Sequence, residues 1–230
     1  MSRGLRKLDS GVWRELRAAS ADQGRWDQRE WWHNKYYRDS AARDGYVLQQ
    51  PEKGEPEVPY KRELFYPSPA SRFSLGEDGC VAYFSKDFAA NCCETIEQFS
   101  SNPDLSFEEL SKYLGGEGNP TPGLFGYPIS FHLARDTLIM DVSMYNSPFF
   151  DAVSRTTGSE AENEFWRVFT SRNTEDKSST QLVARDAKRN GFDGIVYASV
   201  RTPVDVGMPD WNLVMFSPEK LRPGTPPAVS

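Results

Sequence analysis

Two apolar segments in the C-terminal part of the chain constrain its fold more than any other feature. Residues 195–199 (IVYAS) and 212–216 (NLVMF) are short apolar runs, the pattern of β-strands. Residues 180–189 are predicted as a helix that ends at Asn190 and Gly191, because these residue types accept the backbone conformation of a helix end. This part of the chain therefore predicts a helix that leads into a sheet.

The middle of the chain mixes helices and strands with long irregular links. Capping-box pairs predict the starts of two helices, one at Ser106 and one at Ser159. Apolar residues at helical spacing predict another helix after Phe88. Such a mixture favours the α+β class over a regular alternation. The predicted strands here are residues 81–85 and 137–142, and the predicted helices are residues 88–99, 106–114 and 159–169.

The N-terminal part has a different composition from the rest. Four of the six tryptophans lie before residue 60, together with many charged residues. Residues 23–43 are predicted as a polar helix with an aromatic stripe, and residues 51–59 (PEKGEPEVP) as a linker. We therefore divide the chain into an N-terminal helical extension with linker over residues 1–60, a main domain over residues 61–222 and a flexible tail over residues 223–230.

Charge and hydropathy argue against several classes of protein. The net charge of −6 argues against a nucleic-acid partner, because binding phosphate backbones needs clustered Lys and Arg. No run approaches 18 apolar residues, so no membrane-spanning segment is expected, and the start lacks the apolar core of a secretory signal peptide. The cysteines, Cys80, Cys92 and Cys93, do not suggest a disulfide framework. We expect a cytoplasmic protein, acting in its own cell or in a recipient cell if it is a delivered effector.

Metal and cofactor motifs are not found in the sequence. His33 and His132 are far apart and have no cysteine or carboxylate neighbours at ligand spacing, so no metal site is predicted. Neither a P-loop nor the glycine fingerprint of dinucleotide-binding folds occurs. We expect no resident cofactor, and any nucleotide would be bound without these motifs.

Three blocks of residues follow one another in a specific order. Residues 71–74 (SRFS) come first, Tyr83 follows with Glu94 eleven residues later, and residues 191–201 (GFDGIVYASVR) precede the strand at 212–216. A Thr-Gln pair opens the helix before the third block. Each piece alone is weak, but their order and spacing over roughly residues 65–222 resemble the RES-domain family, which is named for Arg, Glu and Ser residues.

The resemblance implies an ADP-ribosyltransferase-like fold, in which a split β core with surrounding helices binds NAD+ in a cleft. Members of the family include toxins of toxin–antitoxin pairs and interbacterial effectors. They deplete NAD+ by hydrolysis or phosphorolysis, and some transfer ADP-ribose to a target. The resemblance therefore implies an NAD+ glycohydrolase or phosphorylase toxin, with NAD+ as substrate and an antitoxin or immunity protein as partner. The alternatives are an ADP-ribosyltransferase and a RES-like module that binds a partner protein without catalysis.

Glu94 and Arg72 are the candidates for the central chemistry. Breaking the bond between nicotinamide and ribose needs no general acid, because the leaving group is already cationic. It does form an oxocarbenium-like ribose, which a carboxylate such as Glu94 can stabilise. Arg72 suits the pyrophosphate or the nicotinamide ribose because a guanidinium offers planar donors.

The remaining candidates contact other parts of the substrate. Tyr83 can stack on the nicotinamide ring and Ser199 can bond a ribose or amide group, while Arg201 and Asn212 are weaker candidates for binding. The family arginine is either Arg72 or Arg14. Residues 12–14 (VWR) fit the short strand with an aromatic–Arg pair that begins many members, which would make residues 15–60 an insertion. Arg72 is favoured because its spacing to Tyr83 is ordinary.

Overall fold

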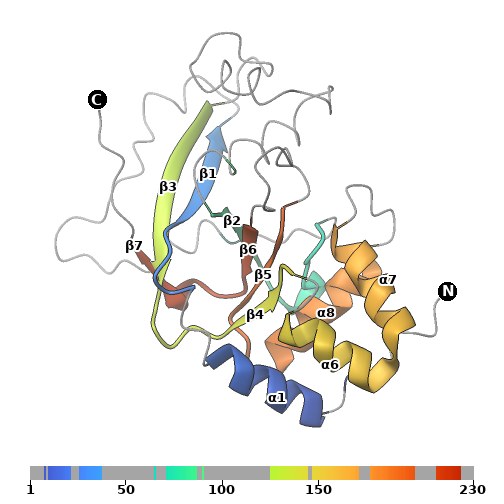
Figure 1. Cartoon of the computed structure of the whole chain (residues 1–230). Helices are drawn as coiled ribbons and strands as arrows, with labels where there is room; N and C mark the ends of the chain where they lie inside the picture. The colour runs from blue at the N-terminus through green and yellow to red at the C-terminus, as the bar shows by residue number, and fades with distance from the viewer. Residues whose placement is uncertain are drawn as a thin grey trace.

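The computed structural model describes residues 8, 10–21, 26–37, 65, 71–86, 90, 125–144, 147–170, 177–199 and 211–223. These residues form a seven-stranded sheet with helices packed beside it (Figure 1). The strands are β1 (Trp31–Tyr37), β2 (Ala82–Ser85), β3 (Phe125–Leu133), β4 (Ile139–Val142), β5 (Gly194–Ala198), β6 (Trp211–Met215) and β7 (Leu221–Pro223). The helices are α1 (Ser10–Ala21), α6 (Pro148–Thr157), α7 (Ser159–Thr170) and α8 (Ser178–Arg189), with 3-10 turns η1 (Gly76–Asp78) and η3 (Pro218–Lys220).

The sheet consists of two halves that meet at one residue pair. The strand order is β4-β5-β6-β2-β1-β3-β7, in which β4 and β5 are parallel and the other neighbours antiparallel. β1 pairs with β3 along its whole length, from Trp31 to Tyr37. It meets β2 only where Trp32 lies opposite Ser85. The mixed sheet confirms the expected α+β class with a split β core.

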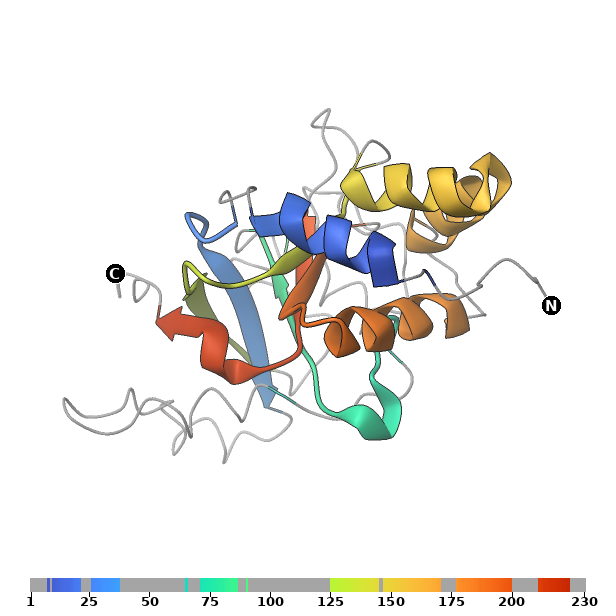
Figure 2. The ribbon, with the colours of Figure 1, turned by 90° about the horizontal axis from the view of Figure 1, so that it is seen from below.

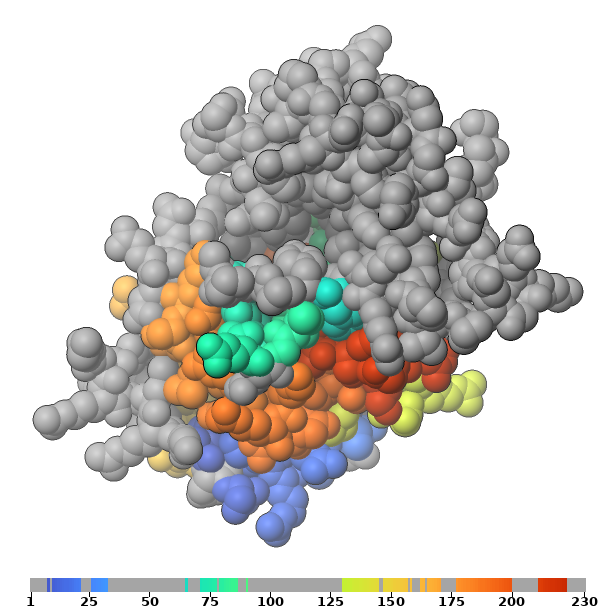
Figure 3. Space-filling view, turned by 180° about the vertical axis from the view of Figure 1, so that it is seen from behind, coloured from blue at the N-terminus to red at the C-terminus, as the bar shows by residue number. Residues whose placement is uncertain are grey.

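Each face of the sheet buries its own set of side chains, because successive residues of a strand point to opposite faces. On the first face, α1, α6, α7 and α8 pack on Ile195, Tyr197 and Val214. On the second face, Phe84 and Phe131 pack together in a separate cluster. Seen from below, α6, α7 and α8 gather on one side of the sheet, away from β1, β3 and β7 (Figure 2). From behind, η1 adjoins the segment that contains α8 (Figure 3).

Two predictions for the N-terminal part are wrong. Residues 31–37, expected in a polar helix over residues 23–43, form strand β1, because their backbone pairs with β3 along its whole length. Residues 12–14, considered as a strand, lie in helix α1, where Val12, Trp13 and Leu16 form its buried side. α1 and β1 both precede residue 60 yet belong to the same core and sheet as the rest. The linker at residues 51–59 lies outside the described residues.

Most of the other predicted elements are confirmed where the structure describes them. Strands β2, β4, β5 and β6 and helices α7 and α8 occur within two residues of the expected bounds. β3 and α6 were not predicted from the sequence. In the helix expected over residues 88–99, Ala90 alone is described, and it is helical and buried. The helix expected over residues 106–114 and residues 224–230 of the tail lie outside the described residues.

The turn from α8 into β5 fixes the position of the central strands. Gly191 ends α8 with a φ of +82°, a conformation that favours glycine. Asp193 then bonds to both neighbouring strands: its backbone N–H donates to Leu138 O at 2.8 Å, and its carbonyl accepts the N–H of Phe216 at 2.9 Å. The Asp193 carboxylate also accepts the N–H of Leu138 at 2.8 Å. Part of the motif at residues 191–201 is therefore explained by the fold itself.

Candidate functional site

A turn at residues 71–73 carries Arg72 and is held by the hydroxyl of Tyr83. This hydroxyl donates to Ser71 Oγ at 2.8 Å and accepts the backbone N–H of Phe73 at 3.1 Å. Tyr83 lies on β2, so the turn is fixed against the sheet by one side chain. The first two sequence blocks, ten to twelve residues apart, are thus brought together directly.

The start of helix α8 holds the same turn from the other side. Gln181 Nε2 donates to the carbonyl of Ser71 at 2.9 Å. The Thr180 hydroxyl donates to the carbonyl of Arg72, and Thr180 is fully buried. The Thr-Gln pair of the sequence therefore positions the backbone on both sides of Cα of Arg72.

The Arg72 side chain reaches the C-terminal end of helix α7. Its Nη1 donates to the carbonyl of Phe169 at 2.9 Å. The carbonyl end of a helix carries partial negative charge, so a guanidinium there is stabilising. The ring of Phe73, next in sequence, packs on Tyr197 at 4.6 Å and on Phe169 at 5.9 Å between centroids. Arg72 thus anchors α7 beside the sheet, in addition to any role toward a ligand.

Tyr83, Asn212 and Ser199 lie on the same face of three neighbouring strands. Asn212 of β6 is in register with Ser85 of β2 and with Tyr197 of β5. Tyr83 precedes Ser85 by two residues and Ser199 follows Tyr197 by two, so strand alternation places them all on one face. Asn212 is 3% exposed and Ser199 is 8% exposed. Polar groups are thus gathered inside the fold beside the Arg72 turn.

Ser85, Trp32 and Ser130 continue this row of side chains across the sheet, and none of the three was predicted as a site residue. Trp32 lies opposite Ser85 on one side and Ser130 on the other. Ser130 Oγ donates to the carboxylate of Glu30 at 2.6 Å. The place of Ser85 could have been predicted, because a residue two positions after Tyr83 in a strand points to the same face of the sheet. For Trp32 and Ser130 no signal existed, because the pairing of β1 with its neighbours is not visible in the sequence.

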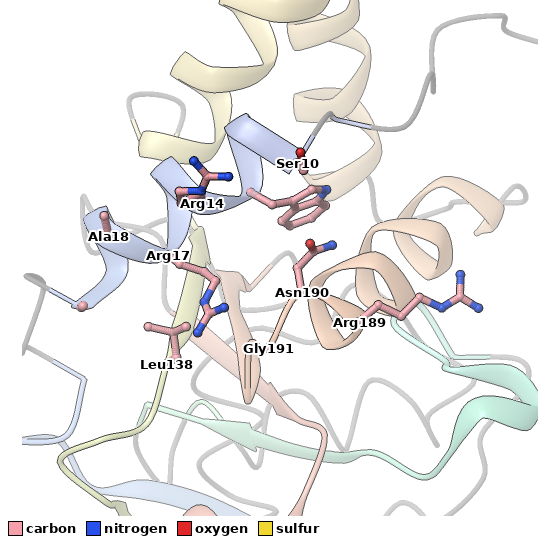
Figure 4. A pocket seen from close by; sticks show the side chains of 10 residues that line it. Ser10, Arg14, Arg17, Ala18, Leu138, Arg189, Asn190 and Gly191 are labelled. Carbon is pink, nitrogen blue, oxygen red and sulfur yellow. The ribbon is translucent and has the colours of Figure 1, made fainter.

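Two of the predicted site residues, Glu94 and Arg201, lie outside the described residues. Arg14 lies on α1, where it lines a cavity of about 620 Å³ together with Arg17 and Arg189 (Figure 4). That cavity borders the turn before β5, whereas Ser199 follows the other end of β5. Arg72, and not Arg14, therefore shares the surroundings of Tyr83.

Among the titratable groups, Asp193 is affected by its position in the fold. Burial raises the pKa of the Asp193 carboxyl, and the hydrogen bond from the Leu138 N–H opposes that shift. Within the described part of the chain, no group of three or more His, Cys, Asp or Glu residues is arranged to hold a metal ion. No described helix is long and apolar enough to cross a membrane.

Comparisons with known proteins identify a family and distant structural relatives. The family model of the RES domain matches residues 37–225. The toxin–antitoxin complex MbcT-MbcA of M. tuberculosis contains a chain 13% identical to this one, with a TM-score of 0.42 over 94% of this chain and 91% of that chain. No curated protein matches the sequence.

Proposed function

The chain belongs to the RES-domain family, and on this premise we propose that it is an NAD+-consuming toxin that cleaves the bond between nicotinamide and ribose. The observation that carries the proposal is the arrangement of Tyr83, Ser199 and Asn212. They share one face of the sheet, beside the turn that holds Arg72. The order and spacing of the sequence blocks led to these same residues.

The reaction needs charge stabilisation more than proton transfer. When the C1′–N bond breaks, its electron pair returns to the nicotinamide ring, which leaves as a neutral molecule. The ribose becomes oxocarbenium-like, and Glu94 is our candidate to stabilise it. In hydrolysis, water bonds to C1′ and loses a proton to solvent, giving ADP-ribose; in phosphorolysis, phosphate takes the place of water.

The other residues are proposed to bind and orient the substrate. Arg72 presents five N–H donors, so its bond to the Phe169 carbonyl is compatible with a second role toward the pyrophosphate. Tyr83 uses its hydroxyl to hold the turn, which leaves its ring as the part that contacts nicotinamide. Asn212 and Ser199 supply buried polar groups to ribose or amide, and Arg201 is proposed to assist them. An ADP-ribosyltransferase-like cleft would bind NAD+ in this way.

A toxin of this kind needs a neutralising partner. We propose an antitoxin or immunity protein that covers the cleft, in the cytoplasm of the producing or the recipient cell. The first alternative is transfer of ADP-ribose to a protein or small molecule on the same site. The second is a RES-like module that binds a partner and leaves NAD+ intact.

The decisive test is incubation of the purified protein with NAD+, with and without phosphate, followed by separation of the products. Hydrolysis gives nicotinamide and ADP-ribose, and phosphorolysis gives a phosphate-dependent ADP-ribose phosphate. Intact NAD+ at high enzyme concentration, without transfer of labelled ADP-ribose to any acceptor, would contradict the proposal.

The matched variants are Glu94→Gln and Glu77→Gln. We expect Glu94→Gln to lower turnover by at least about 100-fold, the size of losses when a charge-stabilising group is removed, while the fold is unchanged. Glu77 lies exposed in η1, so Glu77→Gln should keep full activity. Full activity of the Glu94 variant would remove that residue from the mechanism.

A further inference from the structure

The cavity beside helix α1 is separate from the site described above. It lies between α1 and the turn from α8 to β5, and its volume is about 620 Å³ (Figure 4). Sites for small molecules have volumes of about 300–1,000 Å³. The described residues of the proposed NAD+ site, Arg72, Tyr83, Ser199 and Asn212, do not line this cavity.

The cavity is positively charged. Arg14 and Arg17 of α1 line it together with Arg189 of α8, and no described lining residue is acidic. The nearest acidic residue on α1, Glu15, forms an ion pair with Arg155 of α6 at 2.5 Å. Arg189 has a carboxylate partner in its own helix. Its Nη1 lies 3.8 Å from Oδ1 of Asp186, which is at the outer limit for an ion pair.

Helix α1 places two exposed arginines, Arg14 and Arg17, at this cavity. Arg14 and Arg17 stand three residues apart, so they share one face of the helix, where like charges repel. Cations are favourable near the C-terminal end of a helix. That accounts for Arg189 in the last turn of α8. It does not account for Arg14, which lies near the beginning of α1. A bound anion would account for all three.

The walls of the cavity are fixed by the core. Trp13 is 5% exposed and packs edge-on against Phe192, with ring centroids 6.1 Å apart. Gly191 lacks a Cβ atom, and an added Cβ would lie 3.5 Å from the guanidinium carbon of Arg17. Figure 4 shows the Arg17 side chain extending toward Leu138 and Gly191, with Arg14 and Arg189 on other sides of the opening. Two helices therefore contribute cationic residues to the lining, Arg14 and Arg17 from α1 and Arg189 from α8.

We propose that this cavity binds the phosphate groups of a small phosphorylated molecule. Guanidinium groups bond phosphate oxygens in pairs, and because three arginines line this cavity, a diphosphate offers them more oxygens than a single phosphate does. A hollow of this size favours a small molecule over the flat surface of an acidic protein. The site is distinct from the proposed NAD+ site, and its existence does not depend on NAD+ cleavage.

The test uses isothermal titration calorimetry of the full chain with sodium pyrophosphate, inorganic phosphate, ribose 5-phosphate and ribose. The key variant is Arg17→Gln/Arg189→Gln. The conservative variant is Arg17→Lys/Arg189→Lys, and the control is Arg167→Gln, since Arg167 is an exposed arginine of α7 outside the cavity. Circular dichroism checks that each variant is folded. If the Gln pair fails to fold, the Lys pair decides, because it keeps the charge and loses the paired bonds.

We expect pyrophosphate to bind more tightly than phosphate, ribose 5-phosphate to bind and ribose not to bind. The Gln pair should weaken pyrophosphate binding at least about tenfold, and the Lys pair should weaken it less. Arg167→Gln should have no effect. Absence of binding at millimolar pyrophosphate, equal affinity of the Gln pair and the unchanged chain, or an equal loss in the control would each overturn the proposal. Cavity-dependent binding of an acidic peptide but not of pyrophosphate would replace it with a protein interface.

Discussion

Gly194 occupies a position at which no side chain fits. A Cβ atom added there would lie 2.5 Å from the carbonyl oxygen of Val214 and 2.8 Å from Met215 Sδ. We expect Gly194→Ala to lower the free energy of unfolding by about 2–3 kcal/mol, because strand β5 must move away from β6. Urea unfolding measures the loss. Gly158→Ala provides a comparison: its φ is +89° and its ψ 163°, a region essentially confined to glycine, and an added Cβ would meet no atom within 4 Å. Backbone strain alone should therefore cost about 1–3 kcal/mol there. A Gly194→Ala chain as stable as the unchanged chain would contradict this account.

The hydroxyl and the ring of Tyr83 can be separated by two substitutions. Tyr83→Phe removes the acceptor of the Phe73 N–H, and we expect a loss of about 1–2 kcal/mol in the free energy of unfolding. If the ring contacts nicotinamide, Tyr83→Phe keeps most of the NAD+-cleaving activity of the folded fraction, whereas Tyr83→Leu loses it. Steady-state kinetics with urea unfolding of both variants distinguishes the two roles. Equal activity of the Phe and Leu variants would limit Tyr83 to positioning the turn.

Asp193 makes stability depend on pH in an unusual direction for a carboxyl group. Burial raises its pKa in the folded state, so the folded chain binds the proton more tightly than the unfolded chain. Stability is therefore favoured by protonation and falls as pH rises through the folded pKa. Asp193→Asn keeps an acceptor for the Leu138 N–H without the charge. We expect the Asn variant to gain stability relative to the unchanged chain as pH rises. The free energy of unfolding of the variant minus that of the unchanged chain should therefore be more positive at pH 7 than at pH 3. If this difference is more positive at pH 3 than at pH 7, the folded chain stabilises the ionised form of Asp193 instead.

At the level of elements, the sequence predicts those whose own residues carry the pattern. The apolar runs of β5 and β6 and the capped ends of α7 and α8 are local signals, and these elements occur as expected. Helix α6 also has a local signal, a serine followed by a proline at the first helical position. β1 had none: its residues WWHNKYY fit a helix or a strand equally, and pairing with β3 decides.

The candidate site follows the same rule. Tyr83, Ser199 and Asn212 lie in or directly after strands with clear local patterns, so their placement on one face could be anticipated in part. The bonds of Arg72 to Phe169 and of Gln181 to Ser71 join residues about a hundred positions apart. No local pattern carries that information, and the anchoring of α7 by Arg72 could not be predicted.

Because α1 and β1 belong to the core, the N-terminal part is expected to be needed for folding. Val12, Trp13 and Leu16 are each at least 94% buried, and each contributes about 1.5–3 kcal/mol to a total stability of typically about 5–15 kcal/mol. A chain that begins at residue 38 should therefore lack a cooperative thermal transition. A chain that begins at residue 8 should keep it. A stable domain without residues 8–37 would restore the view of an N-terminal extension.

At the scale of the whole molecule, the single residue pair between β1 and β2 divides the sheet into two halves. β5 and β6 lie inside one half and are buried throughout except at Trp211. We expect their amides to exchange with solvent most slowly, and those of the short strand β7 to exchange faster. Hydrogen exchange followed by mass spectrometry tests this. Equal protection of both halves would show that the sheet opens as one unit.

The pairing of β2 with β6 also limits the order in which the chain can fold during its synthesis. Ser85 and Asn212 are neighbours in the sheet but lie more than half the chain apart in sequence. Contacts of this separation form slowly, since a long loop must close first. During synthesis, β2 has no partner in its own half of the sheet until β6 has been made. The face that gathers Tyr83, Ser199 and Asn212 therefore cannot form before the chain has been synthesised through β6.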